Sequence, residues 1–309
     1  RKLRWKNGDN MLNRKIDNDI DAHFSNSKKA LFLTGARQVG KTYSIRKYAK
    51  LHGLNLIEFN FLLQPEAMDI INGAGDVKEL LLRISAYSRV PLVRSKTLIF
   101  FDEVQECPDV MTWVKALVDE GSYIYALSGS LLGVELKDIR SVPVGYMSEM
   151  QVYPMDFEEF VSAVGVPENV LDAVKKSWSE KTLVDAYIHE KMMQLFQLYI
   201  IVGGMPAAVQ TYIDSNNIQN VVKEQRDIIN LYKKDIARYD QDVRKKLYIN
   251  EVFDLIPSEL NAKNKRFILK RLNENMTFGR HENDFIWLKD ADMALPTYNV
   301  EEPVSPLKL

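Results

Sequence analysis

Eight residues near the N-terminus have the types and spacing of a phosphate-binding loop. They are Gly35, Ala36, Arg37, Gln38, Val39, Gly40, Lys41 and Thr42, which fit the pattern G-x-x-x-x-G-K-[ST]. Glycines let the backbone wrap closely around an anion and point its N–H groups inward. Lys41 would reach the β- and γ-phosphates of a nucleotide, and the Thr42 hydroxyl would hold Mg²⁺. We therefore predict a nucleotide site here, with Lys41 as a catalytic residue as well.

Two adjacent acids follow an apolar run further along the chain. Leu98–Phe101 is apolar throughout, and Asp102 and Glu103 come directly after it. This places both acids at the carboxyl end of a buried strand, the edge where open α/β sheets bind ligands. We expect the strand to end between them, with Asp102 holding Mg²⁺ and Glu103 acting as the base that polarises water. Without the loop, the pair would read as two solvated acids.

A third polar group, Ser128-Gly129-Ser130, follows another apolar run. A serine at such a strand end can touch the γ-phosphate or the attacking water, and it can equally cap a helix. The sequence does not choose between Ser128 and Ser130, so both are candidate catalytic residues.

The elements that would position these residues alternate between strand and helix. Short apolar runs bounded by turns predict buried parallel strands at 30–34, 54–60, 97–102, 122–128 and 149–154. Helical stretches lie between them at 42–52, 75–88 and 109–120, and an amphipathic helix precedes them at 12–25. This alternation predicts an α/β domain with three layers and a parallel sheet.

Beyond Pro154 the pattern becomes helical. Asp156 with Glu159 three residues later is a helix start, and long amphipathic stretches follow at 181–201 and 217–239, with a Gly-Gly-Met-Pro turn between them. We divide the chain into an N-terminal extension and helix (1–28), a P-loop ATPase core (29–155), a helical lid (156–256) and a last module with a linker to a further domain (257–309).

Composition excludes several classes of protein. The 309 residues carry a formal charge of −1, which argues against a globally basic nucleic-acid binder. One cysteine rules out a disulfide framework, and four histidines stand at no metal-ligand spacing. The chain has no apolar run long enough for a membrane span and no signal-peptide pattern, so we expect a cytoplasmic protein without a membrane partner.

The motifs TGARQVGKT, LIFFDEVQECP, ALSGSLLG, YPMDFEEF and VGGMP, in this order, resemble one family. It is the prokaryotic AAA-type P-loop ATPases with a C-terminal half of unknown function (DUF4143), relatives of the STAND ATPases. The resemblance implies a five-stranded ASCE-type, AAA-like sheet, a helical lid and a winged-helix module. It also implies that a nuclease-like domain follows in full-length members, which this chain lacks.

One position departs from that family. Many relatives have Gly-Arg shortly before the Tyr-Pro segment, whereas this chain has Val144-Gly145-Tyr146-Met147. If that arginine serves the nucleotide, another must replace it, because an arginine finger neutralises charge in the transition state. Candidates in the chain are Arg37, Arg140, Arg226 and Arg238. An oligomer or a protein partner is the alternative source.

Weaker signals lie elsewhere. Residues 261–271 hold five basic residues and no acid (Lys263, Lys265, Arg266, Lys270 and Arg271), which fits either a DNA-contacting element or a solvated or docking face. We expect Cys107 to be a buried small hydrophobe, His189 to be packed or capping, and the Gly203-Gly204 turn to link helices.

These observations favour an ATPase that binds Mg-ATP and hydrolyses it slowly as a conformational switch. The alternative is a DNA-binding regulator in which nucleotide is a structural ligand. A kinase is disfavoured because an acid beside the metal-binding Asp102 suits activation of water. The chain has no N/T-K-x-D tetrapeptide, which would read guanine, so we expect adenine.

Overall fold

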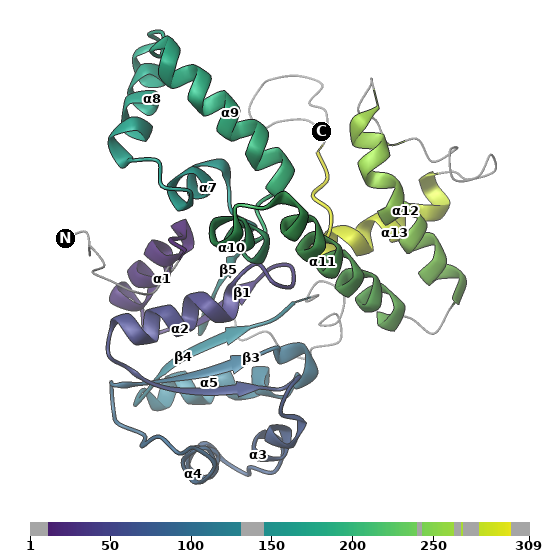
Figure 1. Cartoon of the computed structure of the whole chain (residues 1–309). Helices are drawn as coiled ribbons and strands as arrows, with labels where there is room; N and C mark the ends of the chain where they lie inside the picture. Colours follow the sequence, from purple (N-terminus) through teal and green to yellow (C-terminus); the bar gives the residue numbers. More distant parts are fainter. Residues whose placement is uncertain (1–11, 131–144, 240–242, 263–266, 268–277, 298–309) are drawn as a thin grey trace.

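The computed structural model describes residues 12–130, 145–239, 243–262, 267 and 278–297. Helices and strands alternate as far as β5, and only helices follow it among the described elements (Figure 1). The elements that lead into the sheet and build it are α1 (Lys15–Asn26), β1 (Ala30–Thr34), α2 (Lys41–Leu51), β2 (Asn55–Asn60), α3 (Met68–Asn72), α4 (Val77–Tyr87), β3 (Thr97–Asp102), α5 (Val110–Glu120), β4 (Ile124–Ser128) and β5 (Met147–Gln151). Short 3-10 turns, η1 (Pro65–Ala67) and η2 (Val104–Glu106), precede α3 and follow β3.

The five strands form one parallel sheet in the order β2-β3-β4-β1-β5. This confirms the predicted fold class, an α/β P-loop NTPase sheet. The fifth strand is Met147–Gln151 and not 149–154, because its ladder with β1 pairs Ala30 with Met147 and Thr34 with Gln151. Pro154 has no N–H to extend that ladder.

Helices cover both faces of the sheet, and successive residues of β1 divide between the two cores. Ala30 and Phe32 pack with α3, α4 and α5, whereas Leu31 and Leu33 pack with α1 and α2. Because neighbouring side chains on a strand point to opposite faces, a strand buried on both sides is apolar at every position. β1 and β3 are buried along their whole length, which is why they appear in the sequence as uninterrupted apolar runs.

The helices after β5 lie beyond one edge of the sheet, away from α3 and α4 (Figure 1). They are α7 (Phe157–Ala163), α8 (Glu168–Glu180), α9 (Ala186–Val202), α10 (Pro206–Ser215), α11 (Ile218–Tyr239), α12 (Val243–Asn261) and α13 (Phe278–Asp290). The predicted start at Asp156 is confirmed, because Asp156 and Glu159 form a reciprocal capping box. Pro206 is the first residue of α10, as its missing N–H requires.

The region expected to be a winged-helix module is described only in part. Helix α12 continues through Pro257 to Asn261, and α13 packs against it around Trp287 and Leu288. Most of the basic stretch 261–271 lies outside the described residues, so its DNA role stays a prediction. The winged-helix arrangement is not confirmed. Within the described ranges no single helix is long and apolar enough to cross a membrane, and α9 and α10 pass that test only as a pair bent by 117°.

Candidate functional site at the carboxyl edge of the sheet

The predicted phosphate loop connects β1 to α2. Gly35 and Gly40 have φ of 135° and 100°, and Gln38 between them has φ of 64°. A Cβ at Gly35 would lie 2.3 Å from the Val152 carbonyl oxygen, so no other residue fits there without moving the backbone. The positive φ angles turn the chain back over the start of α2, where helix N–H groups are free to bind an anion.

Lys41 is buried at the first position of α2. Its Nζ donates to the carbonyl oxygens of Gly35 and Ala36, both at 2.8 Å. Burial lowers the pKa of Lys41 to about 8, and the nearby carboxylates of Glu103 and Asp102 oppose that shift. The lysine therefore folds onto its own loop, where two carbonyls stand in for the anion that a cation at this place would bind.

Asp102 is the last residue of β3 and the centre of a polar cluster. Its Oδ2 accepts hydrogen bonds from Thr42 Oγ1 and Asn60 Nδ2, each at 2.9 Å, and its Oδ1 accepts from the Ser128 hydroxyl. Burial raises the pKa of Asp102, while the bonds from Ser128 and Thr42 lower it. Three strands and α2 thus place their polar ends around one buried carboxyl group.

Glu103 leaves the strand at once, as expected from the strand ending between the two acids. Its backbone is left-handed, with φ of 56° and ψ of 52°, which is strained for a residue other than glycine. Its Oε2 accepts from Gln105 Nε2 at 2.6 Å and from Ser130 Oγ at 2.9 Å. The two acids therefore face different partners.

The two candidate serines are separated by these contacts. Ser128 bonds Asp102 and Ser130 bonds Glu103, and both serines are fully buried. The sequence could not choose between them because each of the two acids has a serine of its own.

The four candidate arginines lie in different places. Arg140 and Val144 are outside the described residues, and Arg226 and Arg238 are exposed on α11. Arg37 lies within the loop, where its Nε is 3.2 Å from Asp235 Oδ2 of α11. Arg37 is therefore the candidate that the structure places beside the predicted phosphate site.

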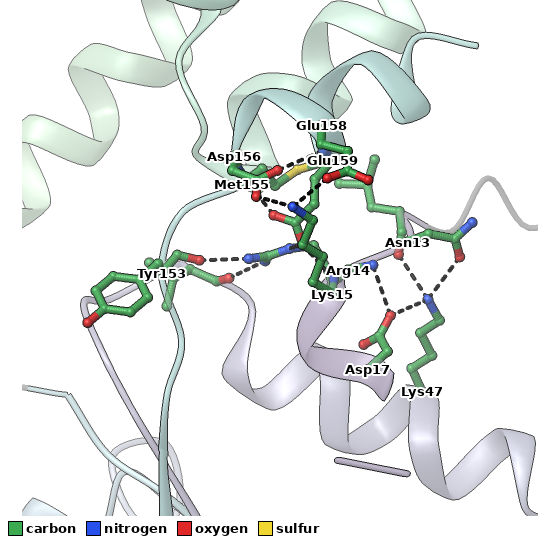
Figure 2. A network of polar contacts seen from close by, with 12 residues as sticks. Asn13, Arg14, Lys15, Asp17, Lys47, Tyr153, Met155, Asp156, Glu158 and Glu159 are labelled. Atoms are coloured by element: carbon green, nitrogen blue, oxygen red, sulfur yellow. Dashed lines mark hydrogen bonds and ion pairs between the residues drawn. The ribbon is translucent and has the colours of Figure 1, made fainter. Parts of the chain in front are cut away.

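A buried guanidinium outside the motif supports the loop. Arg14, just before α1, donates from Nη1 to the Val39 carbonyl at 2.8 Å, from Nη2 to the Tyr153 carbonyl at 2.6 Å and from Nε to Glu159 at 3.0 Å. Figure 2 shows this side chain lying between the loop, the segment after β5 and the start of α7. Lys47 of α2 continues the cluster, since its Nζ binds Asp17 at 2.7 Å.

Three weaker predictions have mixed outcomes. Cys107 is buried, as expected, and burial raises the pKa of its thiol to about 11. His189 is exposed on α9, so the expectation of a packed or capping histidine is wrong. The Gly203-Gly204 turn links α9 to α10, and a Cβ at Gly204 would lie 2.2 Å from the Met155 carbonyl oxygen.

Four contact residues of the site were not predicted. Asn60 stands opposite Asp102 in the β2–β3 register, and a polar residue ending an apolar strand was the available signal. Gln105 has no comparable signal, because it acts from a 3-10 turn. Arg14 and Asp235 are distant in sequence from the loop that they contact, and no local pattern announces them.

The comparisons with known proteins agree with this geometry. Residues 27–161 match the model of a family described as an AAA domain, and residues 193–306 match a domain of unknown function, DUF8612. The first segment contains the loop, both acids and both serines, and it is an AAA-type P-loop domain. The expected identity of the second segment, DUF4143, is not confirmed. No curated protein matches the sequence.

Solved structures share the fold at low identity. The Walker-type ATPase PABY2304 of Pyrococcus abyssi has a TM-score of 0.53 and 15% identity, over 91% of this chain and 90% of that chain. Lower scores are found with the ORC1 protein of Aeropyrum pernix in complex with DNA (TM-score 0.33, 16% identity, 90% and 81% covered) and with Cdc6p of Pyrobaculum aerophilum (0.36, 13%, 89% and 79%). At these identities the first likeness is one of fold.

Proposed function

We propose that the chain is a cytoplasmic ATPase that binds Mg-ATP and hydrolyses it slowly as a conformational switch. The observation that carries the proposal is the contact between the end of the phosphate loop and the end of β3, where Thr42 Oγ1 lies 2.9 Å from Asp102 Oδ2. Lys41, with its Nζ bound to the loop carbonyls, lies in the electrostatic reach of both acids. A cation for phosphate, a hydroxyl and a carboxylate for a metal, and a second acid therefore belong to one site.

The donor set around Asp102 fits Mg²⁺. Thr42 and Asp102 both offer oxygen, the ligand type that Mg²⁺ prefers, and they come from two elements that meet at this edge. No group of three or more His, Cys, Asp or Glu side chains in the described ranges could hold a metal by itself. Mg²⁺ in nucleotide sites takes one or two protein ligands and completes its shell with phosphate oxygens and water, so a two-residue site is sufficient. Bound Mg²⁺ would neutralise charge on the phosphates.

Glu103 is the proposed general base. Its carboxylate is held by the amide of Gln105 and the hydroxyl of Ser130, which fix its direction through two donors. A carboxylate oriented in this way can accept a proton from water, and its half-buried position gives water access. Ser128, by contrast, belongs to the Asp102 cluster, so we assign it to the metal side of the site.

The switch proposal rests on how the later helices contact the loop. A Cβ at Gly40 would lie 3.8 Å from Pro206 at the start of α10, and the Tyr232 hydroxyl of α11 donates to the Arg37 carbonyl at 3.0 Å. A ligand that moves the loop would therefore act directly on two helices. Differential contact of this kind is what allows a ligand to shift a conformational equilibrium.

Lys41→Ala tests the binding site. Because Lys41 is the cation that the motif aims at phosphate, this variant should lose most ATP affinity in equilibrium binding while its circular dichroism stays that of the parent. Lys47→Ala is the matched control, since Lys47 is on the same helix and equally buried but binds Asp17. Tight ATP binding by folded Lys41→Ala would refute the phosphate-loop assignment.

The two acids should then fail in different ways. Asp102→Asn should weaken Mg-dependent binding and hydrolysis together. Glu103→Gln should still bind ATP but hydrolyse it about 10²-fold more slowly in single turnover, the usual scale for loss of a general base. If Glu103→Gln hydrolyses ATP at the parent rate, a nucleotide-binding module without its own base becomes the better assignment.

A further inference from the structure

Arg37 connects the phosphate loop to a helix far along the chain. It is the third residue of the loop, and its Nε lies 3.2 Å from Asp235 Oδ2 near the end of α11. The two side chains are 11% and 2% exposed, so the pair is removed from water. The same helix holds the loop backbone at this residue, through the Tyr232 hydroxyl and the Arg37 carbonyl.

This ion pair is poorly hydrogen-bonded. Among the described residues, neither Arg37 Nε nor Asp235 Oδ2 has a hydrogen-bond partner of acceptable geometry, although both atoms are buried. Burial raises the pKa of Asp235, and the charge of Arg37 opposes that shift. A buried charge that lacks hydrogen bonds costs free energy, which a better partner for either group would recover.

The pair lies within the electrostatic reach of the catalytic groups. Arg37 is one of the charges that lower the pKa of Lys41, and Glu103 is one of those that raise the pKa of Asp235. Lys41 and Glu103 define the two sides of the proposed γ-phosphate position. A guanidinium between them is well suited to the terminal phosphate, because its planar donors match phosphate oxygens better than they match one carboxylate oxygen.

We propose that Arg37 exchanges between Asp235 and the terminal phosphate of ATP, so that the loop carries its own arginine finger and α11 senses whether that phosphate is present. The inference rests on the proposed function and assigns the regulation of the same site. ADP lacks the terminal phosphate and leaves Arg37 with Asp235. ATP takes Arg37, and α11 loses its ion pair to the loop.

Helix α11 is able to pass this change on. Tyr232 packs in the core that includes β1, whereas Ile236, one turn later, packs with Trp287 and Leu288 in the core of α12 and α13. Asp235 lies between these two residues. Release of Arg37 therefore acts on a helix shared by the nucleotide-binding core and the C-terminal helices.

The experiment compares ATP with ADP binding by calorimetry, using a non-hydrolysable ATP analogue, in the full chain and in Asp235→Asn. Removing the competing carboxylate should raise the preference for the ATP analogue over ADP by about 10-fold, within the usual range of coupling between sites. Asp254→Asn is the matched control, because it removes an ion pair of α11 with Lys233 that faces away from the loop. The ratio of the two affinities is independent of the folded fraction, so lower stability of the variant does not affect it.

Arg37→Gln completes the test. It should slow single-turnover hydrolysis by about 10³-fold, the lower end for an arginine finger, and the double variant with Asp235→Asn should show the Arg37→Gln preference with no further gain. If the parent binds and hydrolyses ATP but Asp235→Asn behaves like Asp254→Asn, the exchange is refuted and the proposed function stands. If the parent binds neither nucleotide, both fall.

Discussion

Replacing Arg14 by methionine tests whether one buried guanidinium holds the phosphate loop in place. The variant keeps a long side chain and removes the charge and all donors. It deprives the carbonyls of Val39 and Tyr153 of a partner and leaves Glu159 without its cation (Figure 2).

The magnitude follows from the burial of the pair. The side chains of Arg14 and Glu159 are 5% and 7% exposed, and breaking a buried ion pair from one side costs about 3–5 kcal/mol. Glu159 keeps two backbone donors, Lys15 N at 2.6 Å and Asp156 N at 3.0 Å, which favours the lower end of that range. We therefore expect Arg14→Met to lower the free energy of unfolding by about 3 kcal/mol, a large share of the 5–15 kcal/mol typical of domains.

Urea unfolding followed by circular dichroism measures this loss. Arg46→Met is the control with the same replacement, because Arg46 forms a bidentate pair with Glu58 but its side chain is 57% exposed. Exposed pairs contribute about 1 kcal/mol or less, so the control should stay close to the parent. Adding Glu159→Gln to Arg14→Met should recover part of the loss, since it removes the unpaired buried charge. If Arg14→Met costs no more than Arg46→Met, Arg14 does not stabilise this junction.

Two further predictions concern pH and DNA. Because burial lowers the pKa of Lys41 to about 8 in the free protein, ATP affinity should fall as pH rises from 7 to 9, and Lys41→Met should flatten that profile. The unfolded chain binds more protons at Lys41 between pH 8 and 10.5, so this residue should make the parent more stable as pH rises through that window, an effect that Lys41→Met removes in urea titrations. If residues 261–271 contact DNA, the chain should bind duplex DNA at about 50 mM salt with a steep salt dependence, and replacing Lys263, Lys265 and Arg266 by Glu should abolish binding. Absence of salt-sensitive binding in filter or anisotropy assays would contradict the DNA role.

Local patterns predicted the parts of the site that lie next to strands. Apolar runs buried on both faces located β1 and β3, and the loop and acids follow directly in sequence, so their meeting at one sheet edge could be inferred. The change of backbone at Glu103 was also predictable, since two adjacent side chains on a strand point to opposite faces.

Contacts between distant segments could not be predicted in this way. Arg14 meets Glu159, and Arg37 meets Asp235, across long stretches of chain whose relative placement depends on helix packing. Each of these four residues has the local pattern of an ordinary surface charge. The start of α1 was placed too early for a related reason, because the extended backbone at Arg14 accompanies its contacts with the loop and α7.

The all-parallel sheet determines when the nucleotide site can be completed during synthesis. β1 leads into the phosphate loop, but its neighbours are β4 and β5, and Leu31 stands opposite Ala126 and Ser148. Roughly a hundred residues must therefore leave the ribosome before β1 can pair with any strand, a high contact order that slows folding. Until then the loop has no rigid strand behind it and no Asp102 cluster beside it. Nucleotide can thus stabilise the finished domain but cannot act as a template for its first folding steps.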